Sequence, residues 1–159
     1  MCLSTCSTTS PDSGARRATS YKRQANDSDD RGTGRESGKD SFRDLTVWQR
    51  AVDVAGDVYR LTETYPKRET YGLTSQMRRC AASIPANIAE GRGRHGDGDF
   101  LRFLYIAAGS LAELETFVEL SRRLDYATND ELAPLERSVE EVGRMLQGLI
   151  CTVREAVKK

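Results

Sequence analysis

The sequence predicts an all-α fold, an antiparallel up-down-up-down four-helix bundle preceded by a disordered N-terminal tail. Four segments carry apolar residues at the three- and four-residue spacing of an amphipathic helix, and no segment shows the alternation of a strand. The expected connections are short, which favours antiparallel neighbours. Because 159 residues suit a single domain, we expect a disordered tail at 1–43 and a four-helix bundle domain at 44–159.

The tail is rich in Ser, Thr, Gly, Asp and Arg, and its few large apolar residues are Met1, Leu3, Tyr21 and Phe42. Such a segment cannot bury enough apolar surface to offset the conformational entropy lost on folding. It also lacks the apolar run of a secretory signal, and the whole chain lacks the roughly 20 consecutive apolar residues of a membrane span. We therefore expect a cytoplasmic protein that does not associate with membranes.

The first helix is predicted over residues 46–64. Asp44 or Thr46 is the expected cap, and Pro66 ends the helix because proline disfavours helical geometry in the residue before it. Its predicted core face is the stripe Trp48, Val52, Ala55 and Tyr59, with Ala51 and Val58 beside it.

The second helix is predicted over residues 70–91, with a kink at Pro85, where the backbone hydrogen bond to Ala81 is lost. The alternative is two short helices, the second capped by Ser83. One kinked helix is favoured because the apolar phase is the same on both sides of the proline. The stripe is Leu73, Met77, Cys80 or Ala81, Ile84 and Ile88, and the glycine-rich segment 91–98 that follows is predicted to be a flexible basic connector.

The third helix is predicted over residues 98–124, with Asp97 or Asp99 as its cap. Its stripe is Leu101, Leu104, Ala108, Leu111, Leu114 or Glu115, Val118 and Ser121. Further large apolar residues lie outside this stripe, which suggests self-association; they are Phe100, Phe103, Tyr105, Ile106 and Phe117.

The fourth helix shows the most regular pattern. Asn129 or Asp130 is its expected cap, and Pro134 is tolerated in the first turn. The heptad pattern would also suit a seam between subunits. Its apolar residues are Leu132, Leu135, Val139, Val142, Leu146, Leu149 and Val153.

The segment Ser83–Gly91, with the sequence SIPANIAEG, resembles the proteins encoded within intervening sequences of bacterial 23S ribosomal RNA genes. Blocks at 44–49, 71–79 and 100–116 fit the same family, so the resemblance covers roughly 42–150. The resemblance implies a left-handed four-helix bundle kinked at Pro85, a ring-like homopentamer and no catalytic activity. A relative, the accessory protein of diversity-generating retroelements, has a basic surface that engages RNA and a reverse transcriptase.

Charge is unevenly distributed although the chain is neutral overall. Residues 67–102 contain seven basic and four acidic residues, a net charge of +3, whereas residues 113–141 contain nine acidic and three basic residues, a net charge of −6. Guanidinium groups bind phosphates without reading sequence, and the resemblance favours RNA. The predicted nucleic-acid-binding residues are Arg78, Arg79, Arg92, Arg94 and Arg102.

An ordinary solvated helix face with salt bridges is the alternative interpretation of these five arginines. Few aromatic residues interleave with them in the sequence, so base stacking is not expected and binding should be sensitive to salt.

Glu115 lies near the centre line of the apolar face of the third helix. A buried carboxylate needs donors or becomes neutral. We therefore predict a structural polar clamp of Asn87, Glu115 and Arg122 that fixes helix register.

No constellation of catalytic or metal-binding residues can be assembled. His95 is the single histidine, and the pair Cys2 and Cys6 has no second pair for zinc. A calcium loop starting at Asp97 would need Glu where Ala108 stands. We expect no enzyme, cofactor or metal, and predict an oligomeric scaffold that binds nucleic acid. The alternative is a protein-interaction module without a nucleic-acid role.

Overall fold

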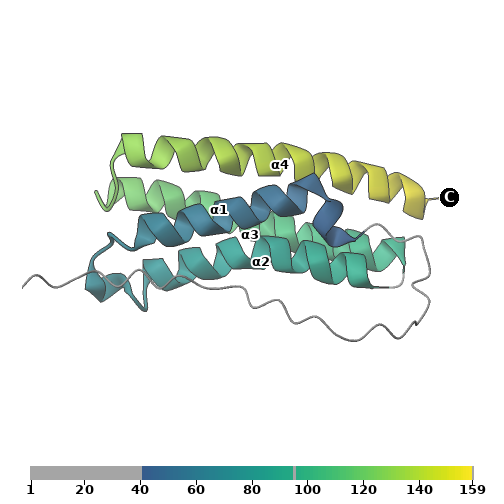
Figure 1. Ribbon diagram of the computed structural model, residues 1–159, viewed down its shortest axis with the longest axis horizontal. Coiled ribbons are helices and arrows are strands. Elements are labelled where there is room, and N and C mark those ends of the chain that lie inside the picture. Colours follow the sequence, from purple (N-terminus) through teal and green to yellow (C-terminus); the bar gives the residue numbers. More distant parts are fainter. Residues whose placement is uncertain (1–40, 95, 159) are drawn as a thin grey trace, which may run out of the picture. The chain divides into compact units, whose positions relative to one another are not determined.

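The computed structural model describes residues 41–94 and 96–158. They form four helices, α1 (Thr46–Thr62), α2 (Leu73–Gly93), α3 (Asp97–Arg123) and α4 (Asn129–Val157), with two 3-10 turns, η1 (Phe42–Asp44) and η2 (Lys67–Glu69). These residues contain no strand. Each helix packs against two others, in the closed order α1, α2, α3, α4, and helices consecutive in sequence run antiparallel around one core (Figure 1). The predicted all-α four-helix bundle is confirmed.

The bundle belongs to a compact unit that extends from Gly38 to Lys159. The predicted tail lies outside the described residues except for 41–43, as do Cys2, Cys6 and His95. Within the described ranges, no helix is long and apolar enough to cross a membrane.

The core faces of α2, α3 and α4 follow the predicted stripes except at three positions. Phe100 and Ala107 of α3 and Ile150 of α4 are buried, whereas the predicted Leu101, Ala108 and Leu149 are only partly buried. Met77 and Ile84 of α2, Leu104 of α3 and Leu132 of α4 have no exposed surface. On α3 the alternative is resolved in favour of Leu114, which is fully buried, while Glu115 is exposed. Periodicity therefore located the dominant apolar stripe of each of these helices, with errors of one residue at the three positions.

The predicted core face of α1 is wrong. Val52 and Tyr59 are 41% and 47% exposed, and the buried face is the neighbouring stripe Val47, Ala51, Val54, Val58 and Thr62. Helix α1 carries two adjacent apolar stripes, and periodicity cannot rank them. The stripe of smaller residues faces the core, while Trp48 packs at the margin with its ring 5.1 Å from that of Phe42.

Helix α2 continues through Pro85 as a single helix, so the alternative of two short helices is excluded. Pro85 is buried, and its missing N–H leaves the carbonyl of Ala81 without its helical partner. Because the helix is unbroken, Ser83 caps no second helix. Its hydroxyl lies 2.9 Å from the hydroxyl of Ser110 on α3.

Three predicted helix caps differ from those observed. Helix α4 is capped by Thr128, which forms a reciprocal capping box with Glu131, and not by the predicted Asn129 or Asp130. Asp44 forms such a box with Ser41 on η1 and does not cap α1. Helix α3 starts after Gly96 without a side-chain cap. Short polar side chains cluster at these boundaries, so sequence alone left the capping residue open.

The predicted connector 91–98 is mostly helical. Gly91 and Gly93 belong to the last turn of α2 and Gly98 to the first turn of α3, which leaves only 94–96 between the helices. Gly96 has φ of 128°, a conformation that favours glycine. Gly96 is therefore the glycine at which the chain turns from α2 into α3.

Candidate nucleic-acid interface

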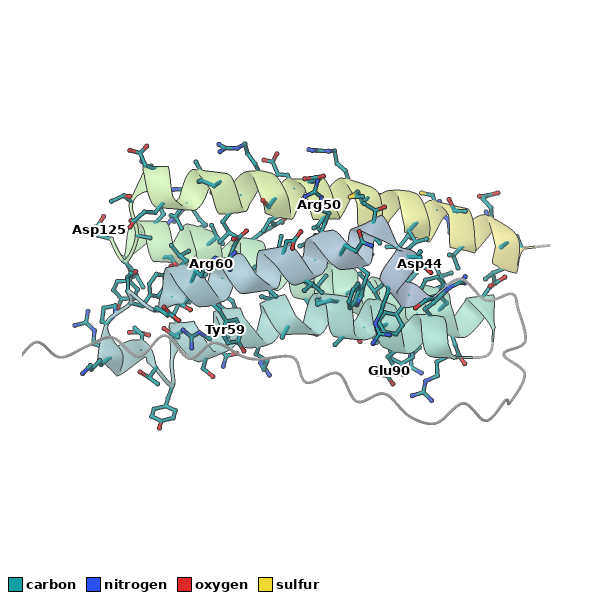
Figure 2. All side chains as sticks on the ribbon, in the orientation of Figure 1. Asp44, Arg50, Tyr59, Arg60, Glu90 and Asp125 are labelled. Atoms are coloured by element: carbon teal, nitrogen blue, oxygen red, sulfur yellow. The ribbon has the colours of Figure 1, made fainter. Side chains whose placement is uncertain are left out.

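The five predicted arginines separate into two groups. Arg78 and Arg79 lie in the first half of α2, whereas Arg92 and Arg94 lie at its end and Arg102 lies on α3. At ~1.5 Å per residue, Arg78 and Arg92 are roughly 20 Å apart along the helix. Figure 2 labels one contact residue of each group: Tyr59, which lies against Arg78, and Glu90, which accepts a hydrogen bond from Arg94. The two labelled residues lie well apart along the bundle.

Arg78 is half-buried and ties α2 to the end of α1. Its Nε donates to Thr62 Oγ1 at 2.8 Å, and its Nη2 donates to the Tyr59 carbonyl at 3.3 Å. The guanidinium also lies 4.7 Å from the centroid of the Tyr59 ring. A cation at the carboxyl end of a helix stabilises its unpaired carbonyls. These contacts give Arg78 a structural role. By contrast, the hydrogen bond of Arg79 to a described residue is to Gln76 of the same helix, at 2.7 Å.

We expect Arg78→Ala to lower the free energy of unfolding by about 1–3 kcal/mol, since two hydrogen bonds from a charged group and a stacked ring are lost. Urea denaturation measures the change. Arg79→Ala is the matched control on the next residue and should change stability by less than about 0.5 kcal/mol. Equal effects of the two substitutions would contradict the structural role of Arg78.

The second group surrounds the junction of α2 and α3. The guanidinium of Arg92 lies 5.8 Å from the centroid of the Phe100 ring, and that of Arg94 lies 5.6 Å from the Phe103 ring. Arg94 also donates to Glu90 at 2.6 Å, and Arg102 is exposed. Aromatic rings therefore accompany Arg92 and Arg94 in space although few interleave with them in the sequence, because the rings come from a different helix.

A small hollow of about 70 Å³ lies at this junction. The backbone amides of the first turn of α3 have no intrahelical acceptors, and the helix dipole places partial positive charge there. Asp97 and Asp99 in the same turn oppose this charge in part. The arrangement suits an oxygen anion held between guanidinium and amide groups. The residues lining the hollow are Gly91, Arg92, Arg94, Gly96, Asp97 and Phe100.

The predicted polar clamp does not form. Glu115 is exposed, and Asn87 donates instead to the carbonyl and the hydroxyl of Ser83, at 2.8 and 2.9 Å. Arg122 donates to Glu136 of α4 and to Glu119, and the hydrogen bond that Glu136 accepts raises the pKa of Arg122. The physical reason is that Leu114 occupies the core position, which rotates Glu115 outward.

A polar seam between α2 and α3 was missed by the sequence analysis. The Cys80 thiol donates to Glu113 Oε2 at 2.9 Å, one turn before the contact between Ser83 and Ser110. Burial, with help from Glu113, raises the pKa of Cys80 to about 12, so the thiol stays protonated near neutral pH and is a poor nucleophile. Contacts between two helices leave no signal in one-dimensional periodicity.

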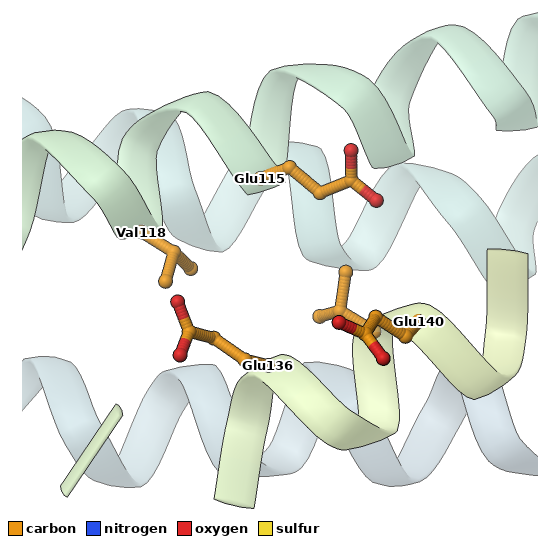
Figure 3. A pocket seen from close by; sticks show the side chains of 5 residues that line it. Glu115, Val118, Glu136 and Glu140 are labelled. Carbon is orange, nitrogen blue, oxygen red and sulfur yellow. The ribbon is translucent and has the colours of Figure 1, made fainter. Parts of the chain in front are cut away.

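An acidic groove of about 360 Å³ lies between α3 and α4 (Figure 3). The carboxylates of Glu115, Glu136 and Glu140 surround it, with Val118 and Val139 as its apolar lining. Arg122 partly neutralises Glu136. Within 41–94 and 96–158, no three acidic, cysteine or histidine side chains are grouped as a metal site would require.

Comparisons with known proteins agree with this architecture. The family model for 23S rRNA-intervening sequence proteins matches residues 43–148. A crystal structure from Bacteroides thetaiotaomicron, described as a protein with unknown function from the S23 ribosomal protein family, is 24% identical, with a TM-score of 0.60. The match covers 66% of this chain and 98% of that chain, and it supports the fold alone. No curated protein sequence matches significantly. The chain belongs to the 23S rRNA-intervening sequence protein family.

Proposed function

We propose that this protein is a non-enzymatic, oligomeric scaffold that binds RNA at the junction of α2 and α3. The observation that carries the proposal is the hollow lined by Arg92 and Arg94 at the uncapped start of α3, with Arg102 exposed on the following turn. Guanidinium groups, amides and a helix dipole together favour the oxygens of a phosphate. Arg79 is a peripheral contact, and Arg78 contributes through folding.

Binding at this junction contacts phosphates and therefore weakens with salt. The aromatic rings of Phe100 and Phe103 hold the guanidinium groups of Arg92 and Arg94 in place, which lowers the entropy lost on binding. The name of the family links its genes to ribosomal RNA, and this supports RNA over DNA as the partner.

The test replaces Arg92, Arg94 and Arg102 together by glutamine, which removes charge and leaves the helices intact. RNA binding is measured across a salt series. We expect at least a tenfold loss of affinity at low salt, and a decrease of about 2 in the slope of log K against log salt, because each phosphate contact to a single strand contributes about 0.7.

The matched control carries the same change in charge at three exposed arginines elsewhere, Arg60, Arg137 and Arg144. This control should retain most of the affinity and of the salt slope. Equal losses in the two triple variants would indicate a general charge effect, and a wild-type protein that retains no RNA at low salt would refute the proposal.

A second candidate function is a protein-interaction module that holds a basic polypeptide in the acidic groove. The three carboxylates of Glu115, Glu136 and Glu140 beside two valines favour it. Partner capture separates the two functions. Complexes that survive nuclease treatment and are lost in Glu140→Lys support the module, whereas complexes lost on nuclease treatment support RNA.

A further inference from the structure

The outer face of α3 carries an exposed apolar patch beside the arginine group. Tyr105 is 50% exposed and Ile106 is 42% exposed, and together with Leu101 they line a shallow hollow of about 470 Å³. Arg102 and Gly98 complete the lining. Exposed apolar side chains gathered in one place with an arginine are typical of a binding surface.

The patch has room for a flat ring. Gly98 lies one turn before Leu101 and Arg102, Gly109 lies one turn after Tyr105, and a Cβ atom at either glycine would meet nothing within 4 Å. The glycines therefore leave open space on the face of α3 that carries Tyr105. Position 109 is in the middle of a helix, where glycine has no conformational advantage over alanine.

The patch includes one of the predicted arginines, Arg102. Arg102 and Tyr105 are three residues apart on one helix, so their side chains are neighbours about 5–6 Å apart at Cβ. Phe103, which lies under Arg94, is about 200° from Tyr105 around the helix, so Arg92 and Arg94 lie outside this patch. A strand whose phosphate contacts the Arg102 guanidinium carries a base within reach of Tyr105.

This proximity decides between two forms of RNA. In a duplex the base faces are covered by stacking, whereas an unpaired base can lie flat on an aromatic side chain. Proteins that bind single-stranded nucleic acids combine arginine side chains, which contact the phosphates, with exposed aromatic rings, on which the bases stack. The negative charge of the strand complements Arg102.

We propose that Tyr105, with Leu101 and Ile106 around it, stacks an unpaired base, so that the junction binds single-stranded RNA in preference to duplex RNA. This inference rests on the proposed function, and it assigns to Tyr105 the role of selecting the strand form. The arginines supply affinity for either form, and the ring adds to the affinity for single strands alone.

The experiment compares single-stranded RNA with a duplex of the same length, using the full chain. We expect Tyr105→Ala to weaken single-strand binding about tenfold and to leave duplex binding within about twofold. Tyr105→Phe should retain the affinity because the ring is kept. Tyr105→Trp should bind more tightly, and the fluorescence of the new indole should be quenched by the single strand.

Tyr71 provides the matched control, since it is 94% exposed and lies at the opposite end of α2. Tyr71→Ala should bind both forms as the wild type does. The inference would be overturned if Tyr105→Ala weakened the binding of both RNA forms equally, or of neither. The proposed function would remain intact as long as binding still depended on the arginines. Loss of self-association in Tyr105→Ala with unchanged strand preference would show instead that a second copy of the chain covers the patch.

Discussion

Replacing Gly91 by alanine is expected to lower the free energy of unfolding by about 1–3 kcal/mol, although alanine is the better helix former. A Cβ atom at this position would lie 2.6 Å from Phe103 Cβ and 3.0 Å from Phe100 Cδ2. Phe103 Cβ is attached directly to the backbone, so it cannot move aside without a shift of α3. The cost of separating α2 from α3 exceeds the gain in helix propensity.

Urea denaturation of Gly91→Ala measures this cost, and Gly109→Ala is the matched control on α3. Its Cβ would meet open space, so the control should be more stable than the wild type by roughly 0.5–1 kcal/mol. Opposite signs for the two glycines are therefore expected. A stabilised Gly91→Ala would show that the helices are not in close contact at this position.

Gly91→Ala should also weaken RNA binding, because Phe100 and Phe103 carry the rings on which Arg92 and Arg94 lie. Displacing these rings displaces the guanidinium groups from the hollow. The loss should be smaller than in the triple glutamine variant, since the charges themselves remain.

Truncating Leu114 to alanine is expected to lower the free energy of unfolding by about 2–5 kcal/mol. The side chain is fully buried, so the change removes apolar contacts and leaves a cavity that the surrounding helices fill only in part. The next residue, Glu115, is exposed at the acidic groove, and Glu115→Ala should change stability by less than about 0.5 kcal/mol. Chemical denaturation of the two variants measures both changes.

This pair tests which of two adjacent residues faces the core, a choice that periodicity left open. If Glu115→Ala were the more damaging change, its carboxylate would be part of a buried polar contact, as the clamp hypothesis required. A similar small effect of both substitutions would indicate that the bundle repacks around this turn of α3.

The wrong core face of α1 and the polar clamp that does not form share one cause. Helix α1 has two adjacent apolar stripes, and α3 has apolar and charged residues next to each other at 114 and 115. In both places the sequence is consistent with two rotations of the helix that differ by about 100°. The neighbouring helices select one rotation, because only one lets the smaller side chains of α1, or Leu114 of α3, fill the space available.

The candidate site was predictable in part. The local excess of arginine was visible in the sequence, but the sequence did not show that Arg78 is bound to the end of α1. Nor did it show that the aromatic rings of α3 lie under Arg92 and Arg94, because those contacts join residues of different helices. The sequence shows where charged residues are concentrated, but the packing of the helices decides which of those side chains are free to bind a ligand.

By itself the sequence determined the number and approximate bounds of the helices, the core face of α2 and most of the core faces of α3 and α4. A helix with one dominant apolar stripe can bury that stripe in only one orientation. The tertiary structure decided the rotation of α1, the exposure of Glu115, the close approach at Gly91 and the contacts of Arg92 and Arg94 with the aromatic rings of α3. The reason is that hydrophobic burial is a property of each segment, whereas shape and charge complementarity exist only between segments already packed together.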